Sequence, residues 1–209
     1  MEQFSVLRQP MPVHRPRGAH RFEVFSPRLN RRITFTRRSI LEQWVLLEAD
    51  ARVVEFCERP GFVQTNGNRR EIDFWARYAD LEELILVADS MPELGRPAIQ
   101  SSSDLDQPIR FVPAAELAAA KIWIDNWHRI LPCIIATRGL VPQSFLDRIP
   151  LFLSAPRRLL DIQTDLSKGD PILVRAACFH LLHSGRIEAP SLHTQELSAL
   201  TEFRLAGHP

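Results

Sequence analysis

The sequence predicts an α/β protein with two structured domains, and three observations support this fold class. Residues 39–50 carry apolar side chains at helical spacing, and the short runs after them favour strands. Residues 84–88 form a wholly apolar run, which is typical of a strand covered on both faces. Residues 158–185 show helical patterns again and precede two short candidate strands. We therefore expect a sheet covered by helices, followed by a smaller domain.

The composition is that of an ordinary globular protein, with 45% hydrophobic and 24% charged residues in a chain of 209. This length allows one large domain or two small ones. The net charge of +1 excludes a protein that binds nucleic acid through its overall charge. Lys121 and Lys168 are the only lysines, so nearly all basic residues are arginines. A GC-rich genome is the simpler explanation, although arginine forks also suit phosphate groups.

The cysteines and the hydropathy pattern predict a cytoplasmic protein. Cys57, Cys133 and Cys178 are odd in number, far apart and without a CxxC pair. We expect reduced thiols instead of a disulfide framework or a zinc site. No apolar run reaches the roughly 18–20 residues of a membrane span, and the N-terminus lacks the apolar core of a secretory signal. We therefore expect no membrane partner.

Residues 1–29 are predicted to form a basic, proline-rich arm. Prolines and arginines are interspersed along it: Pro10, Pro12, Pro16, Pro27, Arg8, Arg15, Arg17, Arg21 and Arg28. Such a segment is not expected to build a regular core element, and an extended conformation fits it best. Its charge would let it lie on an acidic partner or a DNA backbone. A tail that is disordered or lies along the protein surface is an equally good alternative.

Residues 30–155 are predicted to form the first domain, which begins with a helix. Ser39 and Glu42 have the spacing of a capping box at its start. The buried stripe of this helix is expected to comprise Ile40, Leu41, Trp44, Val45 and Leu47.

Strands fill the middle of the first domain. Residues 53–56 are a short candidate strand, and residues 62–65 and 70–77 are expected to form a hairpin around an Asn-Gly turn. A further strand is expected at residues 109–112. A long helix then opens with a proline in its first turn and covers residues 113–130.

Residues 156–209 are predicted to form the second domain, after a change in composition near Pro156. Residues 158–166 have a helical pattern. Asp170 is the expected N-cap of a second helix, which should end at Gly185. Two short strands then complete the outline of a winged helix, a module that binds DNA or protein.

Three acidic residues of the first domain are candidate metal ligands: Glu42, Asp73 and Asp89. If they converge, their oxygens would form a site for a hard divalent cation, which is common in enzymes that cut phosphodiesters. Glu42 alternatively serves only the capping box, and Asp89 alternatively caps a turn. Asp73 has no routine structural role, because a carboxylate buried between Ile72 and Phe74 is costly without a partner.

Other side chains are weaker candidates. His180 and His183 stand three residues apart on one helix, as metal ligands can. Without neighbouring acids or thiols they are expected to be packing and surface residues. The four tryptophans are expected to lie in the core and not to stack on bases.

A set of motifs with characteristic spacing runs through both domains: Ser39, Glu42, Leu47, Glu48, Asp50, Val53, Phe56, Arg59, Pro60, Gly67, Arg69, Asp73, Phe74, Leu159, Leu181, Leu182, Gly185, Ile187, Leu197 and Thr201. Over about residues 30–205, this pattern resembles the TnsA family. TnsA proteins are the endonuclease subunits of heteromeric cut-and-paste transposases. The resemblance implies a restriction-endonuclease-like nuclease domain of the PD-(D/E)xK type followed by a winged-helix domain.

The resemblance implies that Glu42, Asp73 and Asp89 hold Mg²⁺ or Mn²⁺. The family's catalytic lysine should stand at Met91, where this chain has none, and Ile72 replaces the proline of the family's Pro-Asp pair. A cation beside the metal-bound water stabilises charge that develops on the phosphate. Loss of the lysine is therefore expected to slow cleavage by several orders of magnitude.

A cation from elsewhere in the chain could replace this lysine. Lys121, on the long helix after the sheet, is the first candidate for a catalytic role, and Arg96 or Arg110 are alternatives. The other interpretation of Lys121 is a solvated residue on a helix face.

The implied function is that of a TnsA-like subunit acting at transposon ends, beside an integrase-like transposase subunit and an ATPase regulator. The arginines expected to contact DNA are Arg31, Arg32, Arg69 and Arg70. The alternative is a catalytically degenerate scaffold of nuclease fold that binds DNA or partners without cutting. The missing lysine favours the scaffold, and the acidic residues favour the nuclease. A stand-alone restriction or repair nuclease of the same fold is a third possibility.

Overall fold

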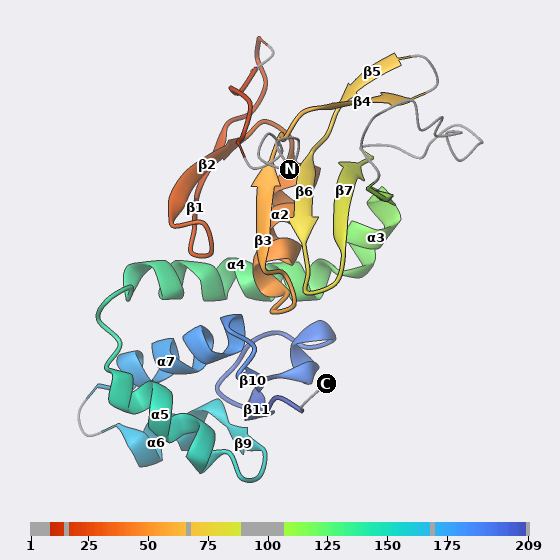
Figure 1. Cartoon of the computed structure of the whole chain (residues 1–209). Helices are drawn as coiled ribbons and strands as arrows, with labels where there is room; N and C mark the ends of the chain where they lie inside the picture. Colours follow the sequence, from red (N-terminus) through yellow and green to blue (C-terminus); the bar gives the residue numbers. More distant parts are fainter. Residues whose placement is uncertain (1–8, 15–16, 66–67, 89–106, 168–169, 208–209) are drawn as a thin grey trace. The chain divides into compact units, whose positions relative to one another are not determined.

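The computed structural model describes residues 9–14, 17–65, 68–88, 107–167 and 170–207 (Figure 1). The chain is a mixed α/β protein, as predicted. Its contacts define two compact units. Unit 1 comprises Met1–Leu47 and Arg52–Ala119, and unit 2 comprises Glu48–Ala51 and Ala120–Pro209. The expected domain boundary at residue 156 falls inside unit 2, because helices before and after it pack together.

Unit 1 contains a four-stranded sheet in the order β3-β6-β7-β8. The strands are β3 (Glu55–Glu58), β6 (Phe74–Arg77), β7 (Glu82–Val87) and β8 (Ile109–Val112). β6 pairs antiparallel with both neighbours, whereas β7 and β8 run parallel. The last five residues of β7 are buried, which confirms the prediction of a covered central strand from its apolar run.

Two hairpins accompany this sheet in unit 1. β1 (Phe22–Ser26) pairs with β2 (Arg31–Phe35), and β4 (Phe62–Thr65) pairs with β5 (Asn68–Glu71). The second hairpin was expected from its Asn-Gly turn. The first was not, because residues 22–26 were assigned to the extended arm. Residues 22–26 contain no proline, so each of them has a main-chain N–H that can donate a hydrogen bond to a partner strand.

The predicted strand at residues 70–77 is divided in two. Ile72 and Asp73 form a link between β5, which belongs to a hairpin, and β6, which belongs to the sheet. The Ile72 N–H donates to the Gly61 carbonyl at 2.9 Å, and the Asp73 N–H donates to the Ile85 carbonyl at 3.1 Å. The link therefore holds Asp73 firmly against β7.

The first helix, α2 (Arg38–Ala49), begins earlier than the capping box predicts. The Leu41 N–H donates to the Arg37 carbonyl at 3.3 Å, so Arg37 occupies the position before the helix. Ser39 consequently lies within the first turn. Trp44, Val45 and Leu47 are buried as expected from the helical pattern.

The long helix expected at residues 113–130 is two helices. α3 (Ala114–Ala119) belongs to unit 1 and α4 (Lys121–Ala136) belongs to unit 2. The interruption falls at Ala120, which precedes α4 with φ −86° and ψ 7°. The apolar periodicity continues across this point, so it does not reveal the break.

After α4, the described part of unit 2 contains α5 (Gln143–Phe152), β9 (Arg157–Arg158), α6 (Leu159–Leu166), α7 (Pro171–His183), β10 (Ile187–Glu188), η1 (Pro190–His193) and β11 (Glu202–Leu205). The three strands form one antiparallel sheet in the order β10-β11-β9. α7 packs against α4, α5 and α6.

Both ends of α7 agree with the sequence prediction. The Asp170 carboxylate accepts hydrogen bonds from the N–H groups of Ile172 at 2.9 Å and Leu173 at 3.3 Å. Gly185 adopts φ 70° after the helix, and its N–H donates to the Leu182 carbonyl at 3.1 Å. Its close approach to Ala51, which also belongs to unit 2, leaves no room for a side chain.

Asn126 on α4 holds the segment after η1 in unit 2. Its side-chain amide is buried and donates to the carbonyls of Leu192 and Gln195, each at 2.8 Å. Its amide oxygen accepts from the Leu197 N–H at 2.7 Å. Three main-chain groups therefore depend on one side chain.

We expect Asn126→Ala to lower the free energy of unfolding of unit 2 by about 2–4 kcal/mol, because buried main-chain groups lose their partners. Alkylation of Cys178 measures this change, since burial of that thiol raises its pKa to about 12 and labelling requires opening. The rate should rise by at least about 30-fold. Cys57 in unit 1, whose pKa is also raised by burial to about 12, is the internal control. Equal acceleration at both thiols would contradict this local role.

Candidate functional site around Asp73

Asp73 is a buried acid of unit 1, with a side chain that is only 3% exposed. Its main chain is held on both sides: the N–H donates to Ile85 of β7, and the carbonyl accepts from the Arg59 N–H at 2.9 Å. Phe74 and Ile72, its neighbours, are fully buried. The carboxylate is therefore fixed where β6 begins, beside the last residues of β7.

Both oxygens of the Asp73 carboxylate accept hydrogen bonds. Oδ2 accepts from the Val87 N–H at 2.7 Å, and Oδ1 accepts from the Arg37 guanidinium at 2.5 Å. Arg37 directly precedes α2, so the start of this helix supplies the cation. Sequence spacing did not predict this ion pair, because its partners stand 36 residues apart.

Burial raises the pKa of Asp73, and the nearby Arg37 and the Val87 N–H oppose this shift. Since the folded pKa lies above the unfolded value, the folded chain binds the proton more tightly. The contribution of Asp73 to stability therefore falls as the pH rises through its folded pKa. A buried acid whose pKa is shifted by burial and by specific charged partners is a candidate functional group.

A second arginine lies close to this carboxylate. Arg70 on β5 donates from its guanidinium to the Val87 carbonyl at 3.0 Å, and its charge also favours ionised Asp73. Burial raises the pKa of the neighbouring Glu71, while Arg59 and Arg37 oppose the shift. Asp73 and Glu71 are thus both influenced by nearby arginine side chains.

Glu58 forms a buried ion cluster on β3, next to this region. Its side chain is 2% exposed and accepts two hydrogen bonds from Arg31, at 2.7 and 2.5 Å. Arg59 approaches it at 3.5 Å. The hydrogen bond from Arg31 to Glu58 raises the pKa of the arginine. Glu58 is not among the site residues predicted from the sequence, and no local pattern marks it, since its main partner is 27 residues away.

Arg59 also fastens part of the N-terminal segment to unit 1. Its carbonyl accepts from the Met11 N–H at 2.9 Å, and its Nε donates to the Met11 carbonyl at 3.2 Å. Its Nη1 donates to the Thr34 carbonyl at 3.1 Å. Arg59 adopts φ 48°, an uncommon conformation for a residue with a side chain. These bonds hold it there and explain why an arginine suits this position.

The predicted acidic set is only partly visible. Glu42 lies on α2 with a side chain that is 24% exposed, and it pairs with Arg38 at 2.9 Å. Asp89 lies outside the described residues, as does Met91. The carboxylate contacts of Asp73 are with Arg37 and Val87, so the described part of the set does not show three converging acids.

The candidate replacement cations have other partners. Lys121 belongs to unit 2, is 62% exposed and pairs with Asp125 at 2.7 Å. Arg110 forms an ion pair with Glu116 and approaches Glu83 at 3.8 Å. Arg96 lies outside the described residues. A catalytic role for Lys121 remains a prediction.

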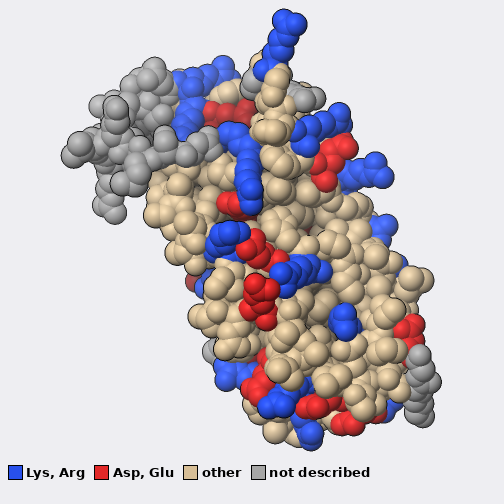
Figure 2. Space-filling model, turned by 180° about the vertical axis from the view of Figure 1, so that it is seen from behind, with Lys and Arg blue, Asp and Glu red and all other residues tan. Residues whose placement is uncertain are grey.

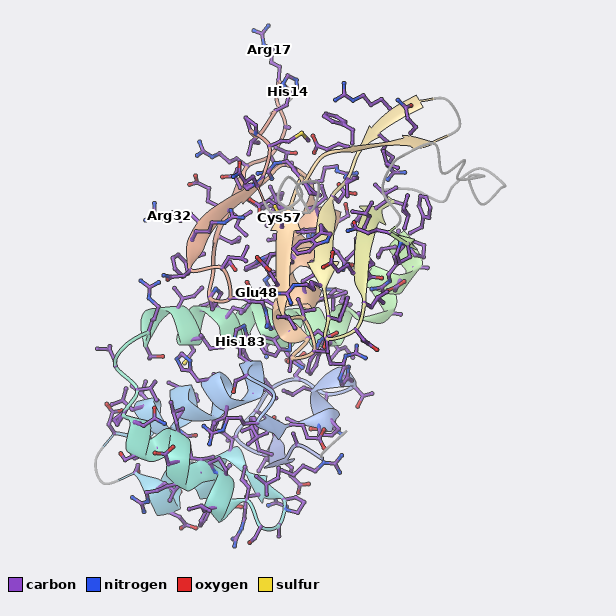
Figure 3. All side chains as sticks on the ribbon, viewed as in Figure 1. His14, Arg17, Arg32, Glu48, Cys57 and His183 are labelled. Atoms are coloured by element: carbon purple, nitrogen blue, oxygen red, sulfur yellow. The ribbon has the colours of Figure 1, made fainter. Side chains whose placement is uncertain are left out.

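The arginines predicted to contact DNA differ in their surroundings. Arg31 is committed to Glu58, and Arg70 is bound to the Val87 carbonyl. Arg69 is exposed, and its guanidinium lies 3.9 Å from the centre of the Phe62 ring. Arg32 is exposed on β2 and points outward (Figure 3). Arg69 and Arg32 are therefore the better placed for phosphate contacts.

The histidines of α7 require a correction. His183 was expected to lack an acidic neighbour, but its Nε2 lies 3.0 Å from the Glu48 carboxylate, which is fully buried and also belongs to unit 2 (Figure 3). The partners are 135 residues apart, so their spacing gave no signal. Burial lowers the pKa of His180. Among the described residues, no group of three His, Cys, Asp or Glu side chains could hold a metal ion.

The arrangement at Asp73 does not fit a divalent ion as it stands. Arg37 already contacts Oδ1, and a divalent ion about 4 Å from its guanidinium would be repelled by about 8 kcal/mol at an effective dielectric constant of about 20. This is an upper figure, because water screens the partly exposed arginine. A metal ion at this carboxylate would have to displace the Arg37 side chain.

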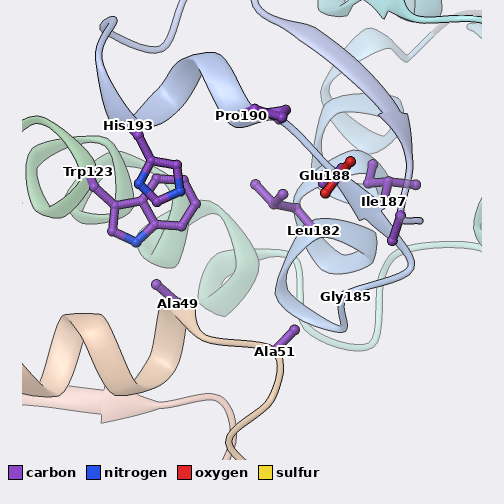
Figure 4. Close-up of a pocket in the computed structure, with 11 residues that line it drawn as sticks. Ala49, Ala51, Trp123, Leu182, Gly185, Ile187, Glu188, Pro190 and His193 are labelled. Atoms are coloured by element: carbon purple, nitrogen blue, oxygen red, sulfur yellow. The ribbon is translucent and has the colours of Figure 1, made fainter. Parts of the chain in front are cut away.

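Unit 2 contains a pocket of about 320 Å³ (Figure 4). Its lining is mainly apolar and comprises Ala49, Ala51, Trp123, Leu182, Gly185, Ile187, Glu188, Ala189, Pro190, His193 and Ala206. Trp123 and His193 stack on each other with ring centres 3.9 Å apart, so these rings are not available to sandwich a ligand. The pocket offers few polar groups that could orient a ligand.

The surface carries charges of both signs. Figure 2 shows basic and acidic side chains interspersed with uncharged areas on one face, in keeping with the net charge of +1. In the part of the chain that the structure describes, no helix has the length and apolar character needed to cross a bilayer.

Comparison with known protein families and with curated proteins found no match to this chain. The resemblance to the TnsA family therefore rests on the residues of the sequence itself.

Proposed function

We propose that this chain is a TnsA-like subunit of a DNA transposition machinery, which binds DNA at transposon ends beside an integrase-like transposase and an ATPase regulator. The observation that carries this proposal is the buried Asp73 between β5 and β6, surrounded by arginines. The order of elements in unit 1 supports a nuclease-like fold: α2 comes before three antiparallel strands, and β8 is added in parallel.

The topology of unit 2 supports a winged-helix module. From α5 to β11, the order is a helix, a short strand, two helices, a strand, the short helix η1 and a last strand. In the sheet, this last strand lies between the other two. Within α7, the exposed positions are confined to Pro171, Ile172 and Arg175. Because its other positions are buried or half-buried, this helix is poorly suited to enter a DNA groove. We infer that unit 2 contacts a protein partner instead.

Within this function, binding without cutting is the better supported alternative. The Arg37 guanidinium neutralises Asp73, and the lysine expected at Met91 is missing. Metal-dependent strand cleavage is the second candidate, favoured by the presence of Glu42, Asp73 and Asp89 in the sequence. Mg²⁺ or Mn²⁺ would then be the cofactor.

Binding to end DNA tests the proposal. Fluorescence anisotropy with duplexes from the two ends of the encoding element should show tighter binding than with scrambled duplexes, in the presence of the partner subunits and without divalent metal. Arg69→Ala should weaken binding to all duplexes and reduce the slope of log Kd against log salt by about one. Arg77→Ala, which removes an arginine paired with Glu55, is the control. Equal affinity for end and scrambled duplexes would contradict end recognition.

A cleavage assay on the same duplexes separates the two candidates. We expect the wild type to leave them intact in Mg²⁺ or Mn²⁺. If the wild type cuts the duplexes, metal-dependent strand cleavage is the function. If Lys121→Ala then no longer cuts, Lys121 is the cation that replaces the missing lysine. If the wild type is inactive and Met91→Lys cuts, the lysine is the only catalytic group that the site lacks.

A further inference from the structure

Asp73 and its cation differ greatly in their access to water. The Asp73 side chain is 3% exposed, whereas the Arg37 side chain is 36% exposed. The acid is fixed by the Val87 N–H and by main-chain bonds on both sides. The guanidinium is the more water-accessible partner of the pair, and it contacts the carboxylate through Oδ1.

The main chain of Arg37 is held in place at the start of α2. Its carbonyl accepts the hydrogen bond from Leu41 at the start of α2, so its Cα has a fixed position relative to the helix. The neighbouring Arg38 points to Glu42 instead, and Arg70 contacts the Val87 carbonyl. Arg37 is therefore the arginine placed to neutralise Asp73 directly.

We propose that Arg37 is a resident counter-cation that excludes divalent ions from Asp73 and thereby keeps this nuclease-like site in a form that does not cut DNA. The inference rests on the proposed function in one respect, that Asp73 stands at the metal position of a nuclease-like fold. A guanidinium bound at Oδ1 supplies the positive charge that a metal ion would bring. It provides neither the open coordination positions nor the bound water that metal-dependent hydrolysis requires.

Removal of this cation should expose a metal site. Arg37→Gln keeps much of the side-chain volume and removes the charge. We expect the affinity of the full chain for Mn²⁺, measured by isothermal titration calorimetry, to rise at least about tenfold over the wild type. The double variant Arg37→Gln/Asp73→Asn should lose this gain, because the carboxylate that binds the ion is absent.

Two further variants separate the specific contact from general electrostatics. Arg77→Gln removes an arginine of the same unit that pairs with Glu55, and its Mn²⁺ affinity should stay within about threefold of the wild type. Arg37→Lys keeps the positive charge beside Asp73 and should resemble the wild type. If Arg77→Gln increases the affinity as much as Arg37→Gln, overall charge is responsible and the proposal is wrong.

Thermal unfolding provides a second measurement in case Arg37→Gln is less stable. Mn²⁺ should raise the unfolding midpoint of Arg37→Gln in proportion to the logarithm of its concentration, and should leave that of the wild type nearly unchanged. Equal Mn²⁺ binding by the two proteins, or no binding by folded Arg37→Gln, would overturn the role of Arg37. The DNA-end assay contains no metal, so a failure of end recognition would count against the proposed function separately.

Discussion

Replacing Glu58 with alanine is expected to lower the free energy of unfolding of unit 1 by about 3 kcal/mol. Glu58 is buried and accepts two hydrogen bonds from Arg31, and its removal also leaves the nearly buried Arg59 without this carboxylate. The value is at the lower end of the range for broken buried pairs, because Arg31 is 36% exposed and regains water. Alkylation of Cys57 in increasing urea measures the change.

Glu55 provides the matched control for Glu58. It lies on the same strand, β3, and also pairs with an arginine, Arg77, at 3.0 Å. Both partners are 33% exposed, so Glu55→Ala should cost less than about 1 kcal/mol. If the two variants lose the same stability, burial does not determine the strength of these pairs. Glu58→Ala should also loosen the segment at Met11, which hydrogen exchange can detect, because Arg59 links the two.

Replacing Phe74 with alanine is expected to have the largest effect on unit 1, about 3–5 kcal/mol. Phe74 is fully buried, and its ring packs against Phe35 with centres 6.0 Å apart and against Phe56 at 6.3 Å. Alanine would leave a cavity between the sheet and β2. Since Asp73 is the adjacent residue, the cavity should also loosen the carboxylate. The Cys57 alkylation assay applies here as well.

Two substitutions test whether the lost volume causes this effect. Phe74→Leu fills most of the cavity and should cost less than half as much. Phe62→Ala removes the same ring from a position that is 39% exposed, and should cost about 1 kcal/mol or less. Similar losses for Phe74→Ala and Phe62→Ala would show that the packing around Phe74 contributes little to stability.

Local sequence patterns predicted the parts of this protein that depend on neighbouring residues. The Asp170 cap and the Gly185 stop define α7 as expected, because each acts within one helical turn. The Asn-Gly turn predicted the hairpin of β4 and β5, and the apolar run at residues 84–88 predicted the buried strand. The burial of Asp73 is also in line with its position between two apolar residues.

Boundaries between elements were less accessible to the sequence. The strand expected at residues 70–77 is interrupted at Ile72 and Asp73, and the helix expected at residues 113–130 is interrupted at Ala120. In both places the apolar periodicity continues, so no local residue reports the interruption. Contacts with other parts of the chain determine these positions, such as the bond from the Asp73 N–H to Ile85.

The sequence by itself determined the fold class, both ends of α7, one hairpin and the candidate acid Asp73. Only the tertiary structure decided which charges meet: Arg37 with Asp73, Arg31 with Glu58, and His183 with Glu48. The physical reason is the range of the interactions. Caps, turns and side-chain periodicity act over a few residues, whereas these ion pairs join residues 27 to 135 positions apart. They form only when the packing of apolar side chains has brought distant segments together.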